Sequence, residues 1–194
     1  MAATPYSSAN QKFSDAAHQA AQSEIYPFVF PIGPPSQIDS VEFVSTSLSM
    51  GDRERIFDGE MAIDRIVKVN NRRLKGPVEF TVQERFRHVE FLGFKDITIT
   101  VWNNRSNLKS ELHKLNAGLM VYGYFNERNG QFNDWVVVQV ALLVHAIVNG
   151  NISYEEKTNP RSQQTFITIK FASLEKIGAI LCSMSRTVEI RKAA

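Results

Sequence analysis

Two segments in the middle of this chain alternate between apolar and polar side chains, and this feature constrains the fold more than any other. Val78, Phe80 and Val82 alternate with polar residues, and residues 97–102 (ITITVW) follow the same rule. A period of two places the apolar side chains of a strand on one face. The pattern predicts strands with one face in a core, so we expect a mainly β fold.

Three further segments are typical of strands: residues 60–69, 119–125 and 132–145. Turn signals separate them from their neighbours. A basic turn at residues 70–73 follows the first strand, and the pair Asn129-Gly130 predicts a tight hairpin between the last two. Together with the two alternating segments, these runs predict a series of five strands.

One helix interrupts this series. Ser106 is suited to cap it, leucines at 108, 112 and 115 have helical spacing, and Gly118 supplies a left-handed stop. The expected order is three strands, a helix at 106–118 and two more strands. This is the order of the oligonucleotide-binding (OB) fold, a closed five-stranded barrel with one helix between strands 3 and 4.

The segment before the barrel is predicted to be an arm. Four prolines interrupt the apolar stretch 25–35, and proline neither continues a helix nor donates to a sheet. We therefore expect an extended or partly disordered arm at residues 1–45, with weak helical potential at 15–22. Its aromatic side chains suggest that it docks on the barrel, which occupies residues 46–147, or on a neighbouring subunit.

Residues 148–194 predict a strand–helix–strand extension. It contains a strand pair at 152–156 and 165–171, a helix that opens at Ser173 and a last strand at 187–190. The run FITIKF resembles the earlier ITITVW, and a serine-capped helix is expected after each. Two interpretations are open. The additional strands extend the sheet or contact a second subunit, or the segment is a duplicated half-domain.

Positive charge is concentrated in one part of the chain. The net charge is only +2, but residues 65–87 hold seven basic and two acidic residues, a local charge of +5. Such a cluster is typical of a surface that meets a polyanion. The one cysteine, Cys182, forms no internal disulfide, and no apolar run reaches the length of a membrane span. We therefore expect a non-secreted, cytoplasmic protein of a bacterial or phage-infected cell.

Residues 97–145 resemble the bacterial and phage single-stranded-DNA-binding protein family. The similar parts are the strand ITITVWN, the helix SNLKSELHKLNAG, the strand LMVYGYF, the turn NERNG and the strand FNDWVVVQVALLV. The resemblance extends more loosely from residue 60, and it does not cover residues 1–50 or 150–194. It implies an OB barrel that binds single-stranded DNA, with Trp102 in the place of the family's stacking aromatic.

Two departures from the family pattern suggest a divergent member. The chain ends in Glu189-Ile-Arg-Lys-Ala-Ala194, where bacterial members carry an acidic tip that recruits partners. Lys95 and Asp96 stand where the family has an upstream stacking aromatic, and Phe94 is the nearest aromatic on that face.

Strand alternation supplies candidate nucleic-acid-binding residues. If the aliphatic side chains fill the barrel, five rings point outward, where each can stack on a base: Phe94, Trp102, Tyr122, Tyr124 and Trp135. Cations near this face are candidate phosphate contacts: Arg72, Arg73, Lys75, Arg85, Arg87 and Arg105. The competing interpretation is that the rings pack across strands or lie beneath the arm or the tail.

No catalytic motif is present. The sequence lacks the phosphate-binding loops, the nucleophile elbow and the metalloprotease motif, and its four histidines are scattered. We expect a non-enzymatic protein without a cofactor or metal that coats single-stranded DNA in replication or recombination, as a homo-oligomer. The alternative is a barrel used as a protein–protein module in a larger assembly, through its arm or its extension. Binding of RNA is a third interpretation.

Overall fold

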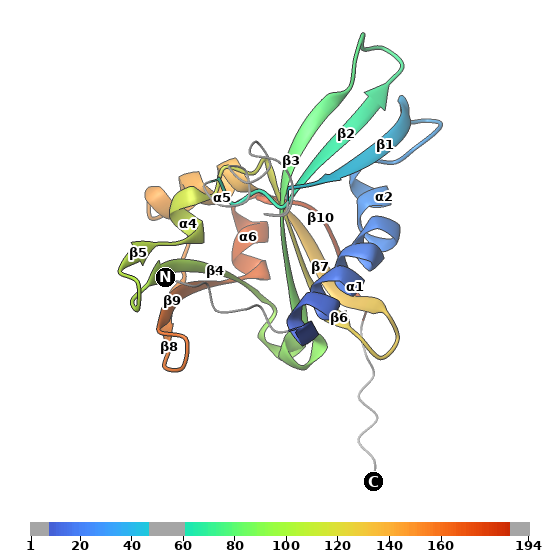
Figure 1. Ribbon diagram of the computed structural model, residues 1–194. Coiled ribbons are helices and arrows are strands. Elements are labelled where there is room, and N and C mark those ends of the chain that lie inside the picture. The colour runs from blue at the N-terminus through green and yellow to red at the C-terminus, as the bar shows by residue number, and fades with distance from the viewer. Residues whose placement is uncertain (1–7, 47–60, 187–194) are drawn as a thin grey trace.

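The structure, a computed structural model, describes residues 8–46 and 61–186 and contains two β-sheets (Figure 1). The large sheet consists of β1 (Ile38–Ser45), β2 (Arg65–Asn71), β3 (Val78–His88), β6 (Leu119–Asn126), β7 (Gln131–Gln139) and β10 (Ile180–Ser185), in that spatial order. The small sheet has the order β5 (Leu108–Lys109), β4 (Asp96–Asn103), β9 (Gln164–Lys170) and β8 (Glu155–Asn159). The prediction of a mainly β fold is confirmed.

These strands form two open sheets and not the single closed barrel that was expected. β3 pairs in parallel with β6, whereas β4 pairs with β9 and not with β3. The reason lies in the similar runs ITITVW and FITIKF. When these two strands run antiparallel, apolar residues lie opposite apolar residues and polar residues opposite polar ones. Ile97 lies opposite Ile169, and Thr98 lies opposite Thr168. β9 therefore presents β4 with a complementary face, and residues 148–186 supply strands to both sheets.

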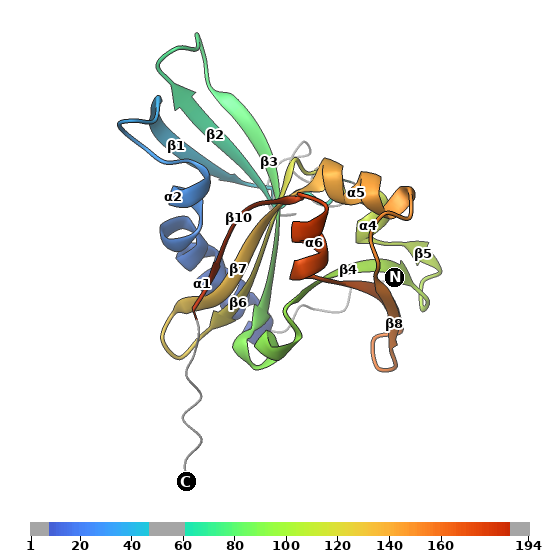
Figure 2. The same cartoon turned by 180° about the vertical axis from the view of Figure 1, so that it is seen from behind.

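Both faces of the large sheet are covered over β6 and β7. Helix α1 (Ser8–Glu24) and the short helix α2 (Tyr26–Val29) pack on one face, as Figures 1 and 2 show from opposite sides. The small sheet, α5 (Val140–Val148) and α6 (Phe171–Lys176) cover the other face. Burial on both sides explains why β6 is almost continuously apolar, since a strand inside two cores has no solvent face.

The N-terminal segment is a docked helix, which corrects the expectation of an extended arm. Phe13, Ala17 and Ala21 are spaced four residues apart, so they form a stripe along α1 that is buried against the large sheet. Because the side chains of the two alanines are small, α1 can approach the large sheet closely. Tyr26 and Phe30 from the proline-interrupted stretch enter the same core. The expectation that this stretch docks on its own chain is therefore correct.

Two further element predictions are wrong in detail. The expected helix at 106–118 is replaced by β5 and the single turn α4 (Glu111–Lys114), whose N-cap position is Ser110. Gly118 is not among the residues with positive φ, so it is not a left-handed stop. The expected strand 132–145 ends at Gln139, where α5 begins, because a continuous apolar run fits a buried helix as well as a buried strand.

The hairpins and the C-terminal elements follow the predictions more closely. Gly130 has a φ of +68° in the turn between β6 and β7, as the Asn-Gly signal predicted. The strand pair expected at 152–156 and 165–171 is present as β8 and β9, which run antiparallel, with β8 shifted to residues 155–159. Helix α6 begins two residues before Ser173. The strand predicted at 187–190 lies outside the described residues.

Candidate nucleic-acid interface

Three of the five candidate stacking rings are buried, which corrects the expected outer face. Tyr122, Tyr124 and Trp135 have relative exposures of 0%, 0% and 1%. The two tyrosines belong to the core between the sheets, and Trp135 belongs to the core beneath α1 and α2, where its ring centroid lies 5.5 Å from that of Phe28. Bases cannot stack on rings that are enclosed on both sides, so these three residues are structural.

The tyrosine hydroxyls join the two sheets. The Tyr124 hydroxyl donates to the backbone oxygen of Asp96 at 2.8 Å, and the Tyr122 hydroxyl lies 3.1 Å from Thr98 Oγ1. Burial raises the pKa of both tyrosines, because an ionised phenol would lose its hydration in this core. Both rings therefore remain neutral and connect β6 to β4.

Arg85 and Arg87 lie on the same face as the tyrosines and form ion pairs. Arg87 Nη1 lies 3.0 Å from Asp96 Oδ1, and Arg85 Nη2 contacts Glu111 Oε2. The side chains of both acids are almost completely buried. Charges buried in this way need their partners, because an unpaired charge in a core is strongly destabilising. Arg87 therefore connects β3 to β4 of the small sheet, and Arg85 connects β3 to α4, so the expectation that both are available for phosphates is corrected.

Trp102 keeps partial exposure at the end of β4. The β4–β9 register shifts between Thr100 and Trp102, so the tryptophan lies opposite Thr165 on one side and Lys109 of β5 on the other. Arg105 in the following turn is exposed, and its Nη2 donates to the backbone oxygen of Arg161 at 3.3 Å. The β4–β5 ladder thus combines an accessible aromatic with nearby cations.

Phe94 is the second accessible ring, and it lies at the opposite end of β4. It is 50% exposed at the end of the 3-10 helix η1 (Val89–Phe94). Arg87 Cζ lies 5.8 Å from its ring centroid, and Lys170 Nζ lies 5.9 Å from it. An exposed ring next to two cations resembles a stacking site in composition.

The three cations of the β2–β3 turn are exposed, as expected. Arg72 forms an ion pair with Asp39, while Arg73 and Lys75 flank the exposed side chain of Leu74. This turn lies at the outer end of β2 and β3, which project away from the remainder of the protein (Figure 1). It is therefore separate from the β4–β5 ladder.

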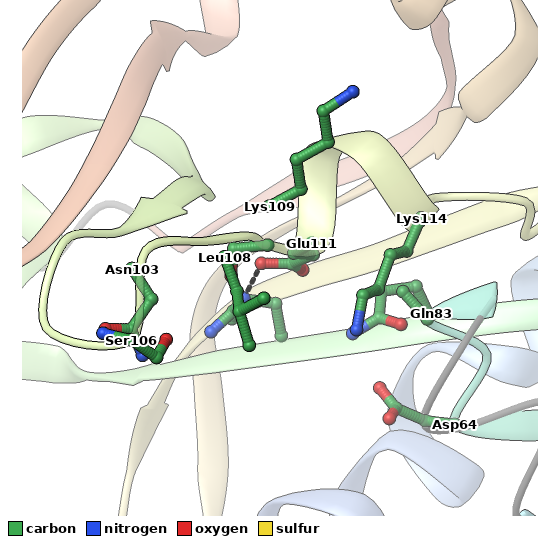
Figure 3. A pocket seen from close by; sticks show the side chains of 11 residues that line it. Asp64, Gln83, Asn103, Ser106, Leu108, Lys109, Glu111 and Lys114 are labelled. Carbon is green, nitrogen blue, oxygen red and sulfur yellow. Dashed lines mark hydrogen bonds and ion pairs between the residues drawn. The ribbon is translucent and has the colours of Figure 1, made fainter.

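A cavity of about 360 Å³ opens beside the β4–β5 ladder, and we call it the β3–β5 cavity (Figure 3). Its lining is polar and comes from three segments of the chain: Ala62, Asp64, Gln83, Arg85, Asn103, Ser106, Leu108, Lys109, Ser110, Glu111 and Lys114. Leu108 is 62% exposed. Figure 3 shows Lys109 extending away from Gln83 and Glu111, while Lys114 points back toward Gln83.

Most of these lining residues were not among the site residues predicted from the sequence. The expected helix at 106–118 assigned Leu108 to an apolar stripe and gave no role to Glu111 or Lys109. No local pattern in the sequence indicated that residues 108–109 would turn back and pair with β4. The pairing of Asn103 with Leu108 turns the chain back on itself and brings Glu111 beside Arg85.

Residues 8–46 and 61–186 offer little support for a metal site, a reactive thiol or a membrane-spanning helix. No group of three or more histidine, cysteine, aspartate or glutamate side chains in these ranges could hold a metal ion. Burial raises the pKa of the Cys182 thiol, which makes it less reactive. None of the helices described here is both long and apolar enough to cross a membrane.

The chain matches no protein-family model and no curated protein sequence.

Proposed function

We propose that this protein binds single-stranded nucleic acid, primarily DNA, without catalysing a reaction. The binding surface in this proposal is the β4–β5 ladder and the mouth of the β3–β5 cavity. The observation that supports it most is the direct pairing of Trp102 with Lys109 across the ladder. An accessible ring for a base and a cation for a phosphate are the two groups that binding of a single strand requires.

Neighbouring side chains extend this surface. Leu108 offers an exposed apolar contact, and Arg105 adds positive charge at the turn that joins the two strands. The exposed turn at residues 72–75 is a second place where the phosphate backbone can be held. Because phosphate contacts release counterions, we expect affinity to fall steeply with salt.

The resemblance of residues 97–145 to the single-stranded-DNA-binding protein family also favours this function. Two antiparallel hairpins, β2–β3 and β6–β7, at the turns expected from the sequence support this part of the proposal. We regard the fold as an opened barrel in which β9 has replaced β3 as the neighbour of β4. The process that such a protein serves is the coating or protection of single strands during replication or recombination.

The test is a fluorescence-anisotropy titration of labelled oligothymidine at low and high salt. Trp102→Ala should weaken binding by about 1–3 kcal/mol, the usual value of one base–aromatic stack. Lys109→Gln should lower the slope of log affinity against log salt by about 0.7. Unchanged affinity in the double variant would rule out this surface.

Two control variants separate binding from general effects. Phe28→Ala removes an exposed ring from α2, and Lys12→Gln removes an exposed cation from α1, both on the opposite face of the large sheet. Neither substitution should change affinity. Competition with oligouridine and with duplex DNA then establishes which nucleic acid is preferred.

The second candidate function is a protein–protein module in a larger assembly. Val78, Phe80 and Leu74 are exposed apolar side chains on the projecting part of β2 and β3. β1 is an edge strand of the large sheet and could pair with another chain. Light scattering coupled to gel filtration tests self-association, and Phe80→Ser should dissociate the oligomer if this surface forms it.

A further inference from the structure

The β3–β5 cavity contains an unusual concentration of polar atoms without partners. Gln83 Oε1, Arg85 Nε and Glu111 Oε1 are buried and have no hydrogen-bond partner within the described part of the chain. Gln83 is only 7% exposed and Glu111 only 9%. The two other atoms of this kind in the described residues, Asn133 Oδ1 and Trp135 Nε1, lie elsewhere, on β7.

Such atoms normally have a partner. A buried donor or acceptor that is left unsatisfied is destabilising, so folded proteins contain few of them. Three such atoms around one cavity therefore indicate a site that a polar ligand completes. Native proteins accept this cost at functional sites in particular.

The hydrogen bonds already present define what the ligand must offer. Glu111 Oε2 is occupied, because it contacts Arg85 Nη2 and accepts from the backbone N–H of Thr100 at 3.2 Å. Among the buried atoms, Glu111 Oε1 therefore remains as one acceptor, Gln83 Oε1 is a second, and the Nε–H of Arg85 is a donor. A ligand that pairs with all three atoms presents two donors and one acceptor.

We propose that this cavity receives a single guanine base of the bound strand, an inference that rests on the proposed function. The Watson–Crick edge of guanine carries two donors, the N1–H and the 2-amino group, and one acceptor, O6. Cytosine, thymine and adenine each offer only one donor group on that edge, so one protein acceptor would stay unpaired. A site built for hydrogen bonds discriminates strongly against a ligand that leaves them unmade.

The position of the cavity agrees with this assignment. Asn103 and Leu108, the pair next to Trp102 and Lys109 in the β4–β5 ladder, line the cavity, so the cavity lies one residue along these strands from the stacking ring. The volume of about 360 Å³ lies within the range of small-ligand sites. The three atoms are closed off from solvent, so side chains of the lining must change rotamer for a base to reach them, as interface side chains commonly do.

The experiment compares oligothymidines that carry one central dG, dI, dA or dC with oligothymidine alone. A single guanine per strand avoids quadruplex formation. We expect the dG strand to bind best and the dI strand, which lacks only the 2-amino donor, to bind about tenfold more weakly. Gln83→Met removes one acceptor at nearly constant shape, so it should bring the ratio of dG to dI affinity close to one. Circular dichroism verifies that this variant is folded.

The outcomes separate the inference from the function on which it rests. Equal affinity for all strands, or a preference for dA or dC, overturns the guanine site and leaves single-strand binding in place. A preference for dG that persists in Gln83→Met also overturns it. Failure of every strand to bind at low salt overturns the proposed function, and the inference with it.

Discussion

The ring of Phe132 occupies the space that a side chain at residue 123 would need. A Cβ atom built on Gly123 would lie 2.6 Å from Phe132 Cδ1 and 2.7 Å from Cε1. The phenylalanine cannot move aside easily, because it is fully buried between the rings of Phe86 and Phe125, at centroid distances of 5.1 and 5.2 Å. Glycine at this position thus allows β6 and β7 to pack closely.

Gly123→Ala should therefore destabilise the protein. Forcing a methyl group into a packed core costs about 1–3 kcal/mol in the free energy of unfolding. Urea denaturation followed by circular dichroism measures the change. Gly118→Ala is the matched control, because its Cβ would lie 3.6 Å from the nearest atom, the Thr81 backbone oxygen, and should change stability by less than about 0.5 kcal/mol. Equal effects of the two substitutions would contradict this packing.

Glu84 connects the N-terminal helices to the large sheet. Its Oε2 lies 2.8 Å from His18 Nδ1 of α1 and 3.3 Å from Arg65 Nε, and its Oε1 accepts from the Tyr26 hydroxyl at 2.7 Å. Glu84→Gln replaces one acceptor oxygen by a donor, so one of these groups loses its partner. We expect a loss of about 1–3 kcal/mol and faster hydrogen exchange of the α1 amides.

The control for this prediction is an exposed ion pair. Glu127 and His88 are 3.2 Å apart, and both side chains are about half exposed. Glu127→Gln should change the stability by less than about 0.5 kcal/mol and leave exchange in α1 unchanged. Unchanged exchange in Glu84→Gln as well would mean that apolar contacts alone hold α1 on the sheet.

Local pattern predicted the strands but not the way in which they assemble. The alternation at 78–86 and 97–102 identified β3 and β4, and Asn129-Gly130 identified the hairpin, because these signals depend on nearest neighbours. The pairing of β4 with β9 depends on residues about 70 positions apart, and no local period encodes it.

The error in the candidate site has a related cause. Assigning Leu119, Val121 and Phe125 to the core implied that Tyr122 and Tyr124 faced solvent, since a strand has two faces. Alternation cannot reveal a second core on the other face, and here helices and a second sheet provide one. The β3–β5 cavity was also beyond prediction, because its lining comes from three separate segments of the chain.

The two tryptophans should differ in fluorescence because their environments differ. Trp135 is 1% exposed, whereas Trp102 is partly open to solvent. In Trp102→Phe the remaining emission should lie at shorter wavelength and resist quenching by acrylamide. In Trp135→Phe the remaining emission should be quenched readily, and by single-stranded DNA too if the proposed function holds. The reverse assignment would contradict the burial of Trp135.

Raising the pH above about 10 should destabilise the protein, because three buried tyrosines must stay neutral in the fold. Burial raises the pKa of Tyr26, Tyr122 and Tyr124, so the unfolded chain ionises at a lower pH than the folded one. The stabilisation is present below the unfolded pKa and is lost as pH rises, by up to about 1.4 kcal/mol per pH unit for each tyrosine. Urea denaturation at about pH 8 and about pH 11 measures the loss. Tyr122→Phe should make the pH dependence shallower than that of the unsubstituted protein. If the pH dependence does not change, Tyr122 ionises in the folded protein as easily as in the unfolded chain, and the polar contact with Thr98 between the sheets is open to water.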